Sequence, residues 1–226
     1  MSRTFFVTGT DTDAGKTIVT CGLLEAARQK QLQTIALKPV AAGCEQTPDG
    51  LRNDDALALI DAMTCQLPYE QVNPVALEPA IAPHIAAKEA GRRITIDRLT
   101  GFSRGALMTK HDIAFIEGAG GWRVPLNDRE MLSGLASSLN ASVILVVCVK
   151  LGCISHSLLT AESVMADGLK LAGWVANVMD PDMNRLGENL ETLTAMMPAP
   201  CLGVVPFLTQ PGKESVAASL DISLLI

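Results

Sequence analysis

Aromatic side chains are scarce in this sequence of 226 residues, with one tyrosine, two tryptophans and five phenylalanines. A hydrophobic core must therefore be built from aliphatic side chains, which suits the valine, isoleucine and leucine runs of parallel strands. Hydrophobic residues make up 48% of the chain, which is enough for a substantial core. We therefore expect one domain that spans residues 1–226.

Clusters of positive charge and long apolar runs are also missing. No stretch concentrates lysine or arginine, and 18 basic against 24 acidic residues leave a net charge of −6, so nucleic acid is not an expected partner. No apolar run reaches the roughly 18 residues of a membrane span, and the first strand begins too early for a signal peptide. We therefore expect a cytoplasmic protein without a membrane partner.

Cysteines occur without the paired Cys-x-x-Cys spacing of zinc or redox sites. The six are Cys21, Cys44, Cys65, Cys148, Cys153 and Cys201. Their irregular spacing favours buried free thiols. Cys153 and His156 lie three residues apart, but no further ligand converges on them, so we expect no metal site there.

Short apolar runs alternate with longer amphipathic segments. The runs predicted as strands are 4–8, 34–39, 113–117, 143–149, 171–177 and 201–206. The segments predicted as helices are 17–30, 54–64, 131–139, 155–167 and 186–197. This alternation predicts an α/β fold of three layers, with a mostly parallel central sheet flanked by helices. The run 143–149 lacks polar alternation and is predicted as a central strand, with strands 4–8 and 113–117 beside it.

Two segments, 40–53 and 65–84, lack this pattern and together contain five prolines. We expect irregular loops there, followed by a pair of helices that ends near Lys110. Loops of this length in a compact domain usually form lids or binding segments. The tail from Thr209 is weakly patterned, and its structure is left open.

The segment 9–17 reads Gly-Thr-Asp-Thr-Asp-Ala-Gly-Lys-Thr and joins the first strand to the first helix. Such a turn points backbone N–H groups and the positive end of the helix dipole at a phosphate. Lys16 can neutralise phosphate charge, and the Thr17 hydroxyl can ligate magnesium. The sequence therefore predicts a site for nucleotide phosphates.

This loop departs from the common motif in two respects. Five residues, rather than four, separate Gly9 from Gly15. The loop also carries Asp11 and Asp13, whose carboxylates a triphosphate would repel. These two side chains must meet a cation or point away from the phosphates.

Polar residues follow several of the predicted strands, where ligands of open parallel sheets bind. Glu117 ends an apolar strand and precedes a glycine cluster, a position where nucleotide hydrolases place a magnesium-holding acid. Lys38 precedes Pro39, which keeps its backbone extended and projects its cation toward the phosphates. Each has an alternative: Glu117 as a solvated acid, Lys38 as a surface lysine, and Asp55 as a helix-capping acid instead of a metal ligand.

Taken together, these segments resemble the dethiobiotin synthetases, P-loop NTPases that catalyse the penultimate step of biotin synthesis. The resemblance runs nearly end to end and is carried by residues 9–17, 38–41, 52–53, 55–57, 73–74, 83–84, 117–122, 150–154, 173–177 and 198–200. It implies an ATP-dependent ring closure of 7,8-diaminononanoate. One amine takes up CO2 as a carbamate, and the carbamate attacks the γ-phosphate to form a carbamic-phosphoric mixed anhydride. The second amine then closes the cyclic urea and releases phosphate.

The resemblance also implies roles for individual residues. Lys16 and Lys38 would stabilise the carbamate and the transferring phosphate, and Thr12 would lie against the reacting end of the substrate. Magnesium would be held by Thr17, Asp55 and Glu117. The residues implied for nucleotide binding are Asp13, Ala14, Gly15, Lys16, Thr17, Asp55, Glu117, Gly118, Ala119, Gly120, Asn177, Pro206, Phe207 and Leu208. Those implied for substrate binding are Thr12, Lys38, Ala42, Lys150, Leu151, Gly152, Cys153, Ile154 and Ser155.

In this family, two subunits pair so that the helix opened by residues 150–155 of one receives the substrate carboxylate bound in the other. Asn177 and residues 206–208 would hold the adenine. A homodimer is therefore implied, with ATP, CO2 and the diamine as small-molecule partners and Mg²⁺ as the cofactor.

Two positions depart from the family pattern. Ala42 stands where family members place a serine that bonds the substrate, and a lost bond to a charged group costs about 1.5 to 3 kcal/mol. That is about one to two powers of ten in affinity. Asp13 replaces what is often glutamate and reaches one methylene less far.

Three other functions stay open. An ATPase switch of the same superclass is disfavoured because the phosphate loop lacks an early lysine and residues 209–226 do not resemble a membrane-binding tail. Ala42 keeps open a paralogue with a different diamine or reduced activity. A purely binding role is disfavoured because Lys16, Thr17, Asp55 and Glu117 are all intact.

Overall fold

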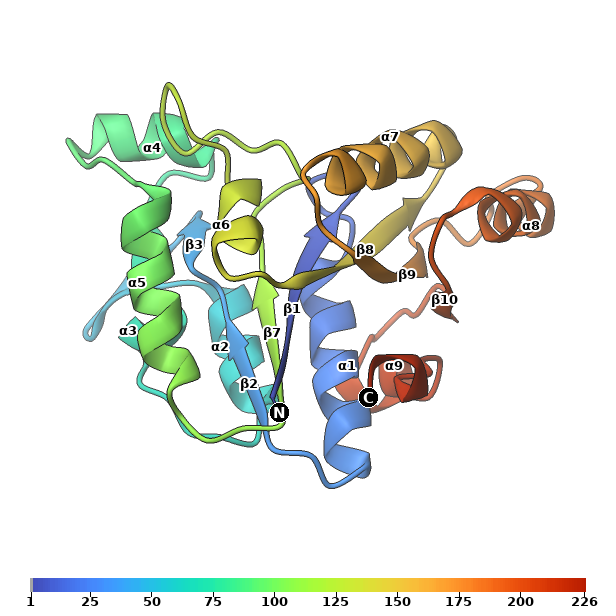
Figure 1. Ribbon diagram of the computed structural model, residues 1–226, viewed down its shortest axis with the longest axis horizontal. Coiled ribbons are helices and arrows are strands. Elements are labelled where there is room, and N and C mark those ends of the chain that lie inside the picture. Colours follow the sequence, from blue (N-terminus) through green and yellow to red (C-terminus); the bar gives the residue numbers. More distant parts are fainter. Residues whose placement is uncertain (1) are drawn as a thin grey trace.

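The computed structural model describes residues 2–226, and within them the largest sheet has six strands, all parallel (Figure 1). In spatial order the strands are β10 (Cys201–Val205), β9 (Leu171–Val178), β8 (Ser142–Val149), β1 (Arg3–Gly9), β7 (Ile113–Glu117) and β2 (Thr34–Leu37). Because all six run the same way, their carboxyl ends share one edge. The polar residues that follow these strands meet there.

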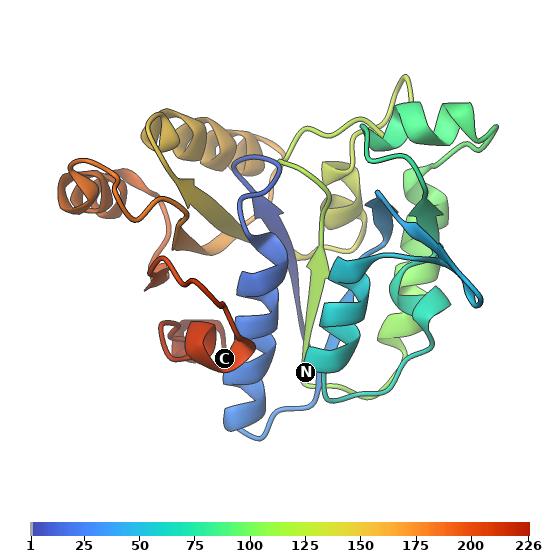
Figure 2. The same cartoon turned by 180° about the vertical axis from the view of Figure 1, so that it is seen from behind.

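Helices cover both faces of this sheet. One face carries α1 (Lys16–Gln29), α2 (Asp54–Ala62) and α9 (Lys213–Ala217), seen in front in Figure 2. The other carries α5 (Ile96–Leu107), α6 (Ser133–Ser138) and α7 (Cys153–Ala166), with α8 (Leu186–Met196) packed beside α7 (Figure 1). The predicted three-layer α/β fold is therefore confirmed.

Strand β8 is buried along its length. Every residue from 143 to 149 is buried, because helices cover the sheet on both sides. The neighbours of β8 are β1 and β9, so the prediction that β7 lies beside it is wrong. The crossover through α1 leaves a gap one strand wide between β1 and β2, and β7 fills it. Apolar periodicity identifies strands but does not encode which strands pair.

The predicted irregular segments contain short regular elements, so that prediction is also wrong in part. The structure has β3 (Val40–Ala42) paired with β6 (Val75–Leu77), a hairpin of β4 (Glu45–Thr47) and β5 (Gly50–Arg52), and the short helix α3 (Tyr69–Val72). Strands of three residues are too short to show alternation. The predicted helix pair is confirmed as α4 (Pro83–Glu89) and α5.

The tail left open by the sequence forms α9 and a 3₁₀ turn at Ser223–Leu225. All six cysteines are free, as predicted, but Cys65 and Cys201 are only half-buried. Within residues 2–226, none of the helices combines the length and the apolar character needed to cross a membrane.

Candidate active site

The loop between β1 and α1 is fixed to the neighbouring strand β8. The Thr10 N–H donates to the Val146 carbonyl oxygen over 3.0 Å, and Thr10 Oγ1 accepts the Cys148 N–H over 3.1 Å. Gly15 begins α1 with a φ of 82°, and a Cβ atom at this position would overlap Asn177 Nδ2. Among the described residues no side chain caps α1, so its first N–H groups are free to bind an anion.

The two loop carboxylates have different surroundings. Asp11 accepts the Thr12 N–H over 2.8 Å and pairs with Lys150 Nζ at 3.0 Å. The hydrogen bond from Lys150 lowers the pKa of Asp11. Asp13 has a left-handed backbone, with a φ of 57°, and lines the cavity described below. The charge of Asp11 is therefore balanced by Lys150. Of the two loop carboxylates, Asp13 lines the cavity and Asp11 does not.

Lys38, Asp55, Glu117 and Thr17 form one bonded cluster beside this loop. Lys38 Nζ donates to Glu117 Oε1 over 2.6 Å and to Asp55 Oδ2 over 2.7 Å. The Thr17 hydroxyl donates to the same Glu117 oxygen over 2.8 Å. The four side chains come from different elements: Thr17 from α1, Asp55 from α2, Glu117 from the end of β7, and Lys38 from the position after β2. They converge although up to 100 residues of sequence separate them.

Electrostatics differ between the two lysines of the site. Burial disfavours the charged form of Lys38, but Glu117 and Asp55 outweigh it and raise the pKa of Lys38. Burial, reinforced by the charge of Lys38, lowers the pKa of Lys16. Burial opposes ionisation of Asp55, yet Lys38 outweighs it and lowers the pKa of Asp55. The contacts within the cluster thus favour the charged forms of Lys38 and Asp55, although the cluster is mostly buried.

The same cluster fits a magnesium ion. Among the described residues, Oε2 of Glu117 is buried without a hydrogen-bond partner, and buried carboxylate oxygens normally have one. Residues 2–226 contain no group of three or more histidines, cysteines or acids that could hold a metal by themselves. Mg²⁺ is usually bound by one or two carboxylates together with substrate phosphates, and two carboxylates with a hydroxyl are what this site offers.

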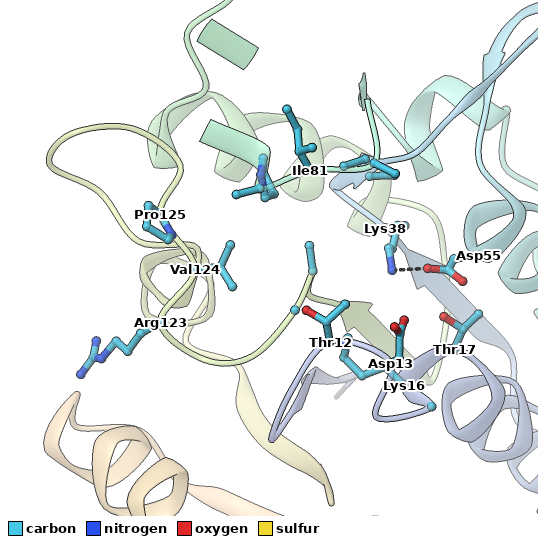
Figure 3. A pocket seen from close by; sticks show the side chains of 18 of the residues that line it. Thr12, Asp13, Lys16, Thr17, Lys38, Asp55, Ile81, Arg123, Val124 and Pro125 are labelled. Atoms are coloured by element: carbon cyan, nitrogen blue, oxygen red, sulfur yellow. Dashed lines mark hydrogen bonds and ion pairs between the residues drawn. The ribbon is translucent and has the colours of Figure 1, made fainter. Parts of the chain in front are cut away.

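A cavity of about 920 Å³ opens above the cluster and the loop. The predicted site residues that line it are Thr12, Asp13, Gly15, Lys16, Thr17, Lys38, Ala42, Asp55, Ala119 and Gly120. Glu117 lies beneath them, fully buried. Figure 3 shows most of the polar side chains at one end, with Lys38 bonded to Asp55, and Arg123 apart from them.

The other lining residues are mostly apolar, and the sequence did not predict them. They are Ile18, Ala41, Ala80, Ile81, Ala82, Pro83, Arg123, Val124 and Pro125. Of these, Ile81, Val124 and Pro125 lie at the end away from Lys38 and Asp55 (Figure 3). The proline-rich segment 65–84 was expected to hold binding residues, and four of the lining residues lie in or beside its end. Nothing in the sequence singled out residues 123–125, which follow Trp122.

The other predicted residues lie outside this cavity. Asn177 is buried and donates from Nδ2 to the Ala14 carbonyl oxygen over 3.0 Å. Ala14 is fully buried, and Gly118 directly follows β7. Residues 206–208 follow β10, with Phe207 exposed. None of these residues lines the cavity, although Asn177 contacts the phosphate loop through Ala14.

Residues 150–155 also lie apart from the cavity, at the start of α7. Gly152 begins this helix with a φ of 94°, and the Leu151 side chain is 94% exposed. Cys153 is fully buried, and its N–H donates to the Lys150 carbonyl oxygen over 2.9 Å. Cys153 therefore cannot offer its side chain to a ligand.

The parallel sheet, the two helix layers and the glycine-rich loop define a P-loop NTPase. A family model described as an AAA domain matches residues 3–215. The ParA family ATPase from Chlorobium tepidum TLS is 14% identical, with a TM-score of 0.58 and coverage of 100% of this chain and 92% of that one. The septum site-determining protein MinD from Pyrococcus horikoshii OT3, complexed with Mg-ADP, is 18% identical, with a TM-score of 0.54 and coverage of 98% and 87%. At these identities the likeness shows the fold alone.

Curated relatives are far more similar. The ATP-dependent dethiobiotin synthetase BioD of Pseudomonas paraeruginosa is 58% identical over 218 residues, which is 96% of each chain. The protein of the same name from Cellvibrio japonicus is 57% identical over 224 residues, 99% of this chain and 98% of the relative. The chain therefore belongs to the AAA-domain family that the model describes and, within it, to the dethiobiotin synthetases. The resemblance stated from the sequence is confirmed.

Proposed function

We propose that this protein uses ATP to join CO2 to 7,8-diaminononanoate and close the cyclic urea of dethiobiotin. The observation that carries the proposal is a cavity with two unlike ends. One end holds Lys16, Lys38 and the phosphate loop, and the other is lined by aliphatic side chains. The charged end matches a carbamate and a triphosphate, and the apolar end matches a methylene chain.

Lys16, Lys38 and the phosphate loop support the following reaction. One amine attacks the carbon of CO2 and loses a proton to water, which leaves a carbamate beside Lys38. The raised pKa of Lys38 keeps it charged, so that it can neutralise this anion. A carbamate oxygen then attacks the γ-phosphorus as the bond to ADP breaks. The second amine attacks the carbonyl carbon of the resulting mixed anhydride and gives up a proton to the departing phosphate, which leaves as the ring closes. Such phosphoryl transfer depends mainly on positioning and charge.

ATP would lie along the loop and the start of α1. The N–H groups of residues 13–17 and the Lys16 ammonium would hold the phosphates, with residues 118–120 beside them. Thr12 would contact the reacting end of the diamine. At the adenine, Asn177 uses its Nδ2 group on Ala14, which leaves its carbonyl oxygen to accept from the base. Residues 206–208 would flank that base.

Thr17, Asp55 and Glu117 would hold Mg²⁺. When bound, the ion neutralises charge that develops on the phosphates during transfer. Lys38 shares both carboxylates and would have to exchange part of this pairing for contact with the carbamate. The orphaned Oε2 of Glu117 supports this assignment.

We further propose that the protein works as a cytoplasmic homodimer of single-domain subunits, with neither nucleic acid nor a membrane as partner. Residues 150–155 lie outside the cavity of their own chain, so their predicted contact with the substrate carboxylate requires a second subunit. Lys150 is half-exposed and held by Asp11. The Cys153 N–H is bonded to the Lys150 carbonyl oxygen, so the N–H groups of Ile154 and Ser155 would support the carboxylate.

The test is phosphate release from Mg-ATP and bicarbonate, with and without 7,8-diaminononanoate, together with mass detection of dethiobiotin. The proposal predicts diamine-dependent phosphate and an equal amount of product. Steady release without the diamine would instead indicate an ATPase switch. No release in either case would indicate a paralogue that uses another diamine or has lost activity.

A further inference from the structure

One wall of the cavity is a segment that contains little regular structure. Residues 118–126, called the wall loop below, run from the end of β7 past the phosphate loop and contribute Ala119, Gly120, Arg123, Val124 and Pro125 to the cavity. Three of its nine residues are glycines, so the loop has a large conformational freedom to lose. Its position must be fixed by contacts with the rest of the fold.

The far end of the wall loop has its own anchors. The Leu126 N–H donates to the Glu130 carbonyl oxygen over 2.9 Å, and the Leu132 N–H donates to the Val124 carbonyl oxygen over 2.8 Å. Asn127 closes the following turn by accepting the Glu130 N–H over 3.1 Å. The middle of the loop, by contrast, is held through two side chains.

Those two side chains converge on one carboxylate at the end of α7. Arg123 donates from Nη1 and Nη2 to Oδ2 and Oδ1 of Asp167 over 2.8 and 2.9 Å. The Trp122 indole N–H donates to the same Oδ2 over 2.9 Å. Arg123 Nη1 has one further contact, 3.3 Å from Ser133 Oγ. Asp167 therefore receives three hydrogen bonds from two consecutive residues of the loop.

Burial makes this more than a surface ion pair. Exposed pairs contribute little, and the Arg123 side chain is half-exposed. Trp122, however, is only 4% exposed and packs edge-on against Phe6 with 5.9 Å between ring centroids. Without Asp167, a buried indole N–H would lose its partner, which is the costly case. The two parallel hydrogen bonds from Arg123 also fix the orientation of its guanidinium relative to the Asp167 carboxylate.

We propose that Asp167 is a positioning residue for the diamine, an inference that rests on the proposed function. The Val124–Leu132 bond holds the far side of Val124 and Pro125, and Asp167, by fixing Trp122 and Arg123, holds the near side, so that both residues face the methylene chain. Figure 3 shows Arg123 turned away from the cavity and Val124 turned into it. Asp167 itself does not line this cavity, so it acts through the wall loop.

Residues 118–120 of the wall loop are proposed to lie beside the phosphates, but Gly118 has its own anchor, because its N–H donates to the Val7 carbonyl oxygen over 2.9 Å. ATP binding is therefore expected to depend on the Asp167 contact less than diamine binding does. The phosphate loop has separate anchors, since Thr10 is bonded to β8 and Ala14 to Asn177. Loosening of the wall loop therefore shifts the apolar wall more than the phosphate cradle. A positioning role for Asp167 therefore predicts that its substitution changes the KM for the diamine and leaves the KM for ATP nearly unchanged.

The experiment compares Asp167→Ala, Asp167→Asn and Asp167→Glu with the wild type. We expect Asp167→Ala to raise the diamine KM about tenfold, in line with the large effect of small misplacements, with the ATP KM changed less than about twofold. Asp167→Asn keeps one acceptor for Trp122 and should fall between. Asp167→Glu should restore most of the affinity. The matched control is Asp61→Ala, which breaks the Asp61–Lys213 pair of 2.7 Å outside the cavity and should change neither KM.

Tryptophan emission gives a second readout that needs no turnover. The protein has two tryptophans, and Trp174 donates to the Ala199 carbonyl oxygen, so a change in Asp167→Ala reports Trp122. An unchanged diamine KM, or equal rises in both KM values, would overturn the role of Asp167 alone. A wild type without diamine-dependent product would overturn the proposed function and this inference with it, whereas emission would still show whether Asp167 anchors the loop.

Discussion

The Lys38 ammonium lies 2.6 Å from Oε1 of Glu117, an oxygen that also accepts the Thr17 hydroxyl. A residue proposed to stabilise the carbamate is thus joined to two residues proposed to hold magnesium. Since Lys38 and Glu117 are both buried, each reduces the cost of keeping the other charged. Substitutions in this cluster should therefore affect both stability and turnover, and the two effects must be measured separately.

Lys38→Ala should reduce kcat about 100- to 1000-fold, the usual effect of removing one preorganised group that stabilises developing charge. ATP binding should stay nearly intact because Lys16 and the loop N–H groups remain. The loss of a partner for buried Glu117 should also lower the free energy of unfolding by up to about 3 to 5 kcal/mol. Single-turnover kinetics, ATP titration and urea unfolding measure the three quantities. Lys30→Ala, at an exposed position after α1, is the control, and unchanged turnover in Lys38→Ala would remove Lys38 from the mechanism.

Glu117→Gln should weaken magnesium-dependent nucleotide binding more than Asp55→Asn does. Glu117 is fully buried and has an unpartnered oxygen, whereas the Asp55 side chain is 44% exposed, so water can replace part of its contribution. Calorimetric titration with ATP, in magnesium and in EDTA, separates the metal-dependent part of binding. If Glu117→Gln bound Mg-ATP as the wild type does, the metal assignment would be wrong.

The charged end of the site could be predicted from sequence because its residues follow local rules. A glycine-rich turn between strand and helix, and polar residues directly after strands, can be recognised without knowing which strands pair. The sequence identified Lys38, Asp55 and Glu117 as site residues but did not predict that they bond to one another. Their contacts depend on β7 lying beside β2.

The apolar end could not be predicted in the same way. Ile81 and Val124 are ordinary aliphatic residues, and they become a binding surface only because distant loops meet across the cavity. The same limit applies to Asp11, whose partner Lys150 is 139 positions away. The order of the strands decides all three cases, and apolar periodicity does not encode that order.

Ala42→Ser tests whether the missing hydroxyl matters. Ala42 lines the cavity at the end of β3, so a serine there could bond a polar group of the substrate. If that bond is made, the diamine KM should fall about ten- to a hundredfold, with the ATP KM unchanged. Ala80→Ser, which places a hydroxyl elsewhere in the same cavity, is the control. An unchanged KM in Ala42→Ser would mean that backbone groups already satisfy the substrate.

Gly22→Ala should destabilise the fold although alanine is the better helix former. Gly22 lies inside α1, and a Cβ there would overlap Val216 of α9, whose own Cβ would be 2.9 Å away. Overpacking of this kind costs about 1 to 3 kcal/mol, against a gain of about 1 kcal/mol in helix propensity. We expect a net loss of about 1 kcal/mol in urea unfolding. Val216→Ala relieves the overlap, so the double variant should lose less than the sum of the two single losses.

Gly101→Ala is the matched control for this prediction. Gly101 lies inside α5 and has no atom within 4 Å of the Cβ position, so alanine should stabilise it by about 0.5 to 1 kcal/mol. If Gly22→Ala stabilised the protein as much as Gly101→Ala does, α9 would move away from α1 at little cost. The close contact between these two helices would then not determine where the tail packs.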